Sequence, residues 1–81
     1  MATTEFTISV DSWTEIGTGP LLVETKQRQN AFLHFADAAP ATGETAYHNL
    51  VGPAAFSYGG TAKCFARAAH GDAKIVVTEA V

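Results

Sequence analysis

The chain has a single cysteine among its 81 residues, so Cys64 has no partner with which to form an internal disulfide. Its three histidines, His34, His48 and His70, are far apart, and no HxH, HxxxH or CxxC spacing occurs, so the sequence predicts no metal site. A domain of this size hides only about 60–65% of its unfolded surface and usually relies on disulfides, a metal or oligomerisation. Oligomerisation is the option that remains, and Cys64 is expected to be a reduced, buried thiol.

Basic residues are also few. The chain has five Lys and Arg residues and eight Asp and Glu residues, which gives a formal net charge of −3. Lys26 and Arg28 are the only close basic pair, whereas nucleic-acid binding needs a basic stripe that neutralises phosphates. No segment approaches the ~18–20 apolar residues of a membrane span, and residues 1–5 lack both the basic and the apolar part of a secretory signal. We therefore expect no nucleic acid and no membrane as partner, and synthesis in a cytoplasm.

What the sequence does contain is apolar runs of strand length, separated by glycine, proline and asparagine. Residues 5–10 alternate between polar and apolar side chains, the period of a strand with one buried face. Comparable runs occupy residues 13–16, 21–25, 31–36, 47–51, 54–58, 62–68 and 74–79. Between them, residues 37–46 are small and include Pro40 and Gly43, which predicts a surface loop with at most one helical turn.

This spacing of strands predicts one all-β domain over residues 1–81. Seven to eight short strands separated by turns are typical of a compact antiparallel β-sandwich, jelly-roll-like or closed into a small barrel. The sequence contains no repeat and no linker, so a second domain is not expected.

Groups that could support catalysis occur without the local context that catalysis needs. The segment Gly17-Thr18-Gly19-Pro20 lacks the rest of either phosphate-binding loop motif and is predicted to be a turn. Ser57 lies within a predicted strand and lacks the sharp glycine-flanked turn that exposes a nucleophile, which argues against a triad with His34 and Asp37. Cys64 with His70 and Asp72 is a second combination, but burial of Cys64 as a small hydrophobe is favoured. We expect that the chain is not an enzyme and that it has no catalytic residue and no cofactor.

Some predicted strands are apolar on both faces. Leu21 and Leu22, Phe32 and Leu33, and Cys64 and Phe65 are neighbours whose side chains point in opposite directions in a strand. Only one face of a thin sheet can meet the core, so the other apolar side chains need a further partner, and a neighbouring subunit is the simplest one. The predicted interface residues are Leu22, Phe32 and Phe65.

Three segments resemble small structural proteins of tailed-bacteriophage virions. They are the segment from Trp13 to Pro20, which leads into a predicted strand, the loop Phe35-Ala36-Asp37-Ala38-Ala39-Pro40 after a hydrophobic strand, and the segment from Phe65 to Glu79. The resembling group includes head-decoration (cement) proteins and the β modules of head fibres and tail knobs. The resemblance implies a multimeric β-sandwich displayed on a particle, made in the bacterial host cytoplasm and located in the virion. The chain would associate with itself, as a trimer or, next in preference, as a dimer. Its other partner would be a capsid or tail protein.

Two alternatives come from other functional classes. In a carbohydrate- or ligand-binding β module of lectin type, Trp13, His48 and Tyr58 would be exposed stacking and hydrogen-bonding groups. A cupin-like enzyme would need clustered His and Glu ligands, and the HxH spacing with which such sites often begin is missing. Aromatic residues exposed in a pocket would favour the lectin, and aromatic residues buried between chains would favour the virion protein.

Overall fold

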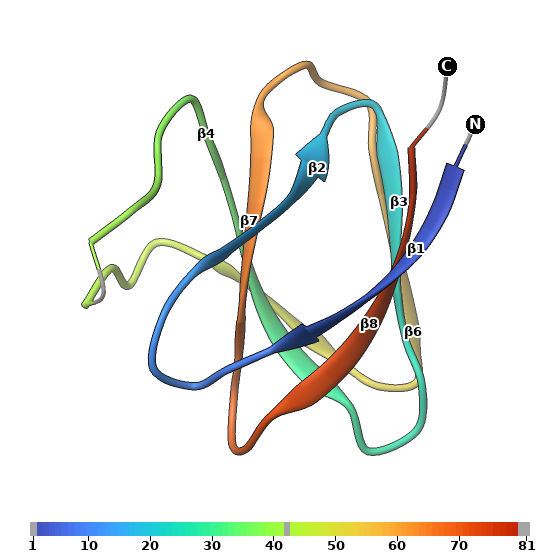
Figure 1. Cartoon of the computed structure of the whole chain (residues 1–81), viewed down its shortest axis with the longest axis vertical. Helices are drawn as coiled ribbons and strands as arrows, with labels where there is room; N and C mark the ends of the chain where they lie inside the picture. The colour runs from blue at the N-terminus through green and yellow to red at the C-terminus, as the bar shows by residue number, and fades with distance from the viewer. Residues whose placement is uncertain (1, 42, 80–81) are drawn as a thin grey trace.

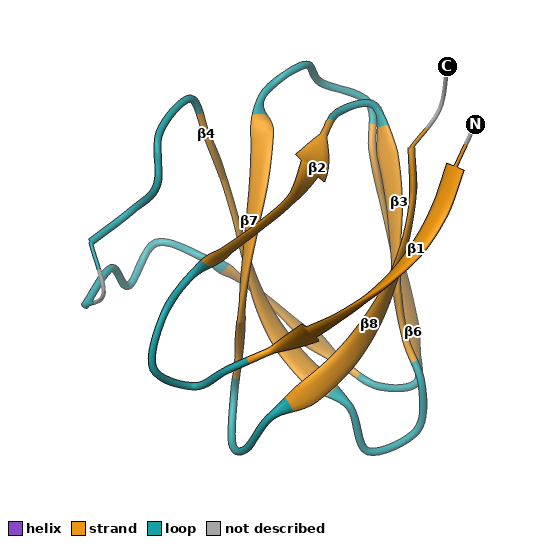
Figure 2. Ribbon diagram, in the orientation of Figure 1, coloured by secondary structure: helices purple, strands orange, loops and turns teal. Residues whose placement is uncertain are grey.

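The chain folds into eight β-strands, which Figures 1 and 2 show in a computed structural model that describes residues 2–41 and 43–79. The described residues contain no helix, and hence none long and apolar enough to cross a membrane. The strands are β1 (Ala2–Ile8), β2 (Thr14–Thr18), β3 (Leu21–Thr25), β4 (Asn30–Ala36), β5 (His48–Val51), β6 (Ala54–Tyr58), β7 (Lys63–Ala68) and β8 (Ala73–Glu79).

The strands form two antiparallel sheets of four, with the order β1-β8-β3-β6 in sheet A and β2-β7-β4-β5 in sheet B. Each strand of the first half pairs with its counterpart in the second half: β1 with β8, β2 with β7, β3 with β6 and β4 with β5. This is the arrangement of one long hairpin rolled into two packed sheets, which defines a jelly roll. The predicted all-β sandwich is therefore confirmed, in its jelly-roll form.

The core lies between the two sheets and is built by alternate residues of each strand. In β3, Leu21 and Val23 are buried while Glu24 is exposed, and in β4 Leu33 is fully buried. This alternation follows from the pleat, which sends successive side chains to opposite faces. The buried apolar residues of the core are Ile8, Ile16, Leu21, Val23, Ala31, Leu33, Leu50, Cys64, Ala66, Ala68, Ala73, Ile75 and Val77.

Several predicted strand limits are corrected, most of them by a residue or two. β1 ends at Ile8, and Val10 is exposed in the following turn because the chain must cross there from sheet A to sheet B. Trp13 lies just before β2, which continues through Gly17 and Thr18, two residues that had been predicted to form a turn. Gly17 has a φ of +155° where the β2–β7 register shifts, so a bulge rather than a turn explains this glycine.

The connection between β4 and β5 is the long loop predicted from composition. It projects from the sandwich as the green-to-yellow segment at the left of Figure 1. The Glu44 carboxylate accepts hydrogen bonds from the backbone N–H groups of Thr45 (3.1 Å) and Ala46 (3.0 Å). These bonds fix the end of the loop directly before Tyr47.

Candidate interaction surfaces

An aromatic surface covers the outer side of sheet B. Its members come from four parts of the chain that the jelly-roll pairing brings together, and all are partly buried: Trp13, Phe32, His34, Tyr47 and Arg67. We call these five residues the aromatic face. Phe32 and His34 share a face because they are two residues apart in β4, and Phe32 is the direct cross-strand partner of Arg67 in β7.

The rings of the aromatic face contact one another closely. Phe32 and Tyr47 are stacked with centroids 4.1 Å apart, and Trp13 is tilted against His34 at 5.8 Å and against Tyr47 at 6.1 Å. The Arg67 guanidinium carbon lies 5.1 Å from the Trp13 ring centroid and 5.5 Å from that of Phe32. A cation held over a ring face is attracted by the negative π-surface, so Arg67 stabilises the positions of both rings.

Hydrogen bonding ties this surface to the long loop. His34 Nδ1 lies 2.6 Å from the carbonyl oxygen of Ala46, which holds the end of the loop against β4. Trp13 Nε1 is buried and has no hydrogen-bond partner among the described residues. A buried indole N–H usually has an acceptor, so Trp13 retains an unmet capacity to donate.

The predicted interface residues lie on different sides of the molecule. Phe32 belongs to the aromatic face, whereas Leu22 is partly buried on the outer side of sheet A. Phe65 lies between the core residues Cys64 and Ala66, so it points to the same outer side as Phe32, but it is only 3% exposed. Phe65 therefore offers almost no surface of its own, and the interface role of all three residues stays a prediction.

A second group of rings comes from the edge strands β5 and β6 and from β4, the neighbour of β5. We call Phe35, His48, Phe56 and Tyr58 the edge cluster. Phe35 stacks on Tyr58 at 4.1 Å and on Phe56 at 5.6 Å, and His48 is tilted against Phe56 at 5.5 Å. His48 and Tyr58 thus share one cluster, while Trp13 lies on the outer side of sheet B. The three residues proposed for a lectin-type site do not converge on one pocket.

The structure separates the residues of the triad considered from sequence. Ser57 is exposed on β6 of sheet A, and His34 belongs to the outer side of sheet B, so the sandwich core lies between them. Cys64 is fully buried, as predicted, and burial raises the pKa of its thiol from 9.0 to about 12. Ionisation to the nucleophilic thiolate is therefore suppressed at neutral pH. In the part of the chain that is described, no three His, Cys, Asp or Glu residues are grouped to hold a metal.

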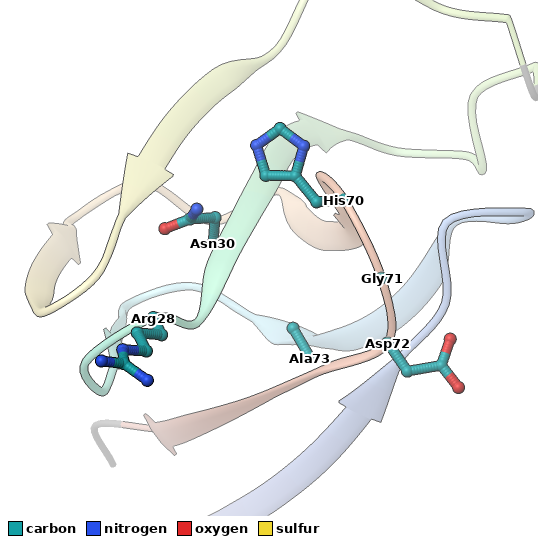
Figure 3. A pocket seen from close by; sticks show the side chains of 6 residues that line it. All are labelled: Arg28, Asn30, His70, Gly71, Asp72 and Ala73. Carbon is teal, nitrogen blue, oxygen red and sulfur yellow. The ribbon is translucent and has the colours of Figure 1, made fainter.

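A polar hollow of about 220 Å³ lies between the β3–β4 and β7–β8 turns (Figure 3). Arg28, Asn30, His70 and Asp72 are among its lining residues, and Figure 3 shows the Asp72 carboxylate directed away from it. The Asn30 side-chain oxygen accepts a hydrogen bond from the Gly52 N–H at 3.0 Å. Arg28, His70 and Asp72 are all exposed, so the hollow has no buried charge with which to select a ligand.

Comparisons with protein-family models, with curated proteins and with solved structures gave no match. The fold itself occurs in viral coat proteins, lectins and cupins alike. Function must therefore be argued from the surfaces rather than from the fold. Sequence reasoning named Phe32 but did not group it with His34, Tyr47 and Arg67. The two-residue spacing of Phe32 and His34 was a usable signal, whereas the Phe32–Arg67 pairing depends on a register that no local pattern reveals.

Proposed function

We propose that the chain is a non-enzymatic structural protein of a phage particle, and that it binds a neighbouring capsid or tail protein through the aromatic face. The observation that supports this proposal is a set of packed rings lying outside a core that is already complete. Leu33 points inward and is fully buried, whereas Phe32 beside it is held outside by Tyr47 and Arg67. Aromatic residues and arginine are the types enriched at the centres of protein interfaces.

The size of the molecule fits a contact made by one face. A specific interface takes roughly 800 Å² from each partner, and the chain exposes 4555 Å² in total. One broad side of the sandwich, with extents of 31 × 27 Å, is about the area required. The rings of the aromatic face are already fixed by mutual contact, so their ordering on binding costs little conformational entropy.

The phage particle as the setting rests on the resemblance of three segments to small virion proteins. Jelly rolls are common in viral coat proteins, which agrees with that setting. On this proposal the chain decorates or stabilises the capsid surface, and its partner is a capsid or tail protein in addition to its own copies.

Substitution of Phe32 by Asp tests the role of the aromatic face. Phe32→Asp should leave a folded protein, because the residue lies outside the core, and should abolish binding to particles that lack the chain. Thr7→Asp is the matched control, since Thr7 is exposed on β1 of the opposite sheet. Co-sedimentation measures binding, and the fluorescence of Trp13, the only tryptophan, should change on binding. Equal binding by Phe32→Asp and wild type would contradict the proposal.

A carbohydrate-binding module is the second candidate, favoured by one observation. Trp13 and Tyr47 lie beside each other and next to Arg67, a combination of stacking rings and a charged donor that suits a sugar-binding site. Titration with bacterial surface oligosaccharides, followed by Trp13 fluorescence, separates the two candidates. Saturable quenching by a sugar, with no binding to particles, would favour the carbohydrate module.

A further inference from the structure

We propose that β6 pairs with the β6 strand of a second copy, in antiparallel orientation, and so joins two copies of sheet A into one continuous sheet. This surface is distinct from the aromatic face, which belongs to sheet B, and goes beyond the proposed function. The inference starts from the sheet edges, because an edge strand leaves every second backbone N–H and C=O available to another strand.

The four edge strands differ in how well they are protected against such pairing. β1 has the exposed Glu5 at its middle, and β2 has the exposed Glu15 next to its bulge. Charges and bulges are the features that prevent edge-to-edge pairing. β5 has only four residues. β6 has five residues, AAFSY, with neither charge nor proline, and its register with β3 is regular throughout.

β6 is also complementary to itself. In an antiparallel pair centred on Phe56, Ala54 faces Tyr58 and Ala55 faces Ser57 of the other copy. Ala55 and Ser57 are the exposed outer residues, and both are small, so two copies can approach without a steric clash or a like-charge contact.

The inner side of β6 supplies an apolar contribution. Phe56 and Tyr58 belong to the edge cluster and remain partly exposed although they pack against Phe35 and the core. A second copy at this edge would cover the rings that the single chain leaves open to water, which adds a hydrophobic term to the backbone hydrogen bonds.

Pairing of a strand with itself has two-fold symmetry, so this inference gives a dimer in place of the trimer that was preferred from sequence. The two proposals can be tested separately, because Phe32→Asp should disrupt particle binding and leave the dimer intact.

The variant Ala55→Lys/Ser57→Lys tests the pairing. It places Lys opposite Lys at both outer positions of the dimer, whereas in the monomer Ala55 pairs with Glu24, so the fold should tolerate the change. Thr3→Lys/Thr4→Lys adds the same charge at two exposed positions of β1, whose cross-strand partners Thr78 and Val77 are uncharged, and is the matched control. Far-UV circular dichroism checks that each variant is folded.

Analytical ultracentrifugation from low micromolar to millimolar concentration is the measurement. Wild type, the β1 control and Phe32→Asp should approach twice the monomer mass, and the β6 variant should remain monomeric. Hydrogen exchange of the β6 amides should slow as wild-type concentration rises. The inference would be overturned if wild type stayed monomeric or formed a trimer. It would also be overturned if the β6 double variant still formed a dimer, or if hydrogen exchange of the β6 amides did not depend on protein concentration.

Discussion

Phe32 and Leu33 are adjacent in β4, yet truncating them should have very different effects on stability. Leu33 is fully buried between the sheets, and a buried Leu→Ala change costs about 2–5 kcal/mol. Phe32 is partly exposed, and the contacts it would lose are its stacking on Tyr47 and on Arg67, so Phe32→Ala should cost about 1–2 kcal/mol. At roughly 0.05–0.15 kcal/mol per residue, the 81-residue chain has a free energy of unfolding of about 4–12 kcal/mol. Leu33→Ala therefore removes a large share of the total stability, and Phe32→Ala removes a small one.

Urea unfolding followed by far-UV circular dichroism is the assay, because ellipticity at these wavelengths reports on the whole sandwich. Trp13 fluorescence serves less well here, since Trp13 belongs to the same aromatic face as Phe32. The unfolding midpoint should fall clearly further for Leu33→Ala than for Phe32→Ala. Equal losses, or a larger loss for Phe32→Ala, would refute the assignment of Leu33 to the core and of Phe32 to the outer surface.

Three further predictions concern the core and one turn. Because burial raises the pKa of Cys64 from 9.0 to about 12, the Cys64 thiol ionises in the unfolded chain but not in the folded chain between these pH values. Stability should therefore fall as pH rises from about 9 to about 12, by at most ~1.4 kcal/mol per pH unit, and urea midpoints of Cys64→Ala should lack this component. Gly19→Ala should lower the melting temperature, because the new Cβ would clash with the backbone carbonyl oxygen of Gly60 and lie 2.6 Å from the Tyr58 ring. A Cβ at Gly43 would have nothing within 4 Å, so Gly43→Ala should not lower the melting temperature. Phe65→Asp should prevent folding, measured by circular dichroism, because Phe65 is buried although it lies outside the central core; a folded variant would contradict this.

The strands could be predicted from sequence because their signal is local. The residues of β3 and β6 were predicted with the limits that the structure has, since glycine, proline or polar residues border each run. Gly17 was assigned to a turn instead of a bulge, because a glycine that needs unusual φ looks the same in both settings. The order of strands within each sheet depends on long-range pairing, which local alternation does not encode.

The interaction surfaces were less predictable than the strands. The alternation of β4 indicated that Phe32 and Leu33 point in opposite directions, and the structure agrees. Which residues surround Phe32 depends on the β4–β7 register and on the return of the loop before Tyr47. Neither follows from spacing along the chain. Phe65, which the sequence predicted as an interface residue, is buried on the outer side of sheet B, and the grouping of Trp13 with Arg67 was not predicted.

The central claim, that the chain is a structural part of a phage particle, is tested most directly by the protein content of particles made from the genome that encodes it. Quantitative mass spectrometry of density-purified particles gives the ratio of this chain to the major capsid protein. The account predicts a fixed ratio that persists through repeated purification and falls sharply for Phe32→Asp but not for Thr7→Asp. Absence of the chain from purified particles, or the lack of any particle from that genome, would contradict the account.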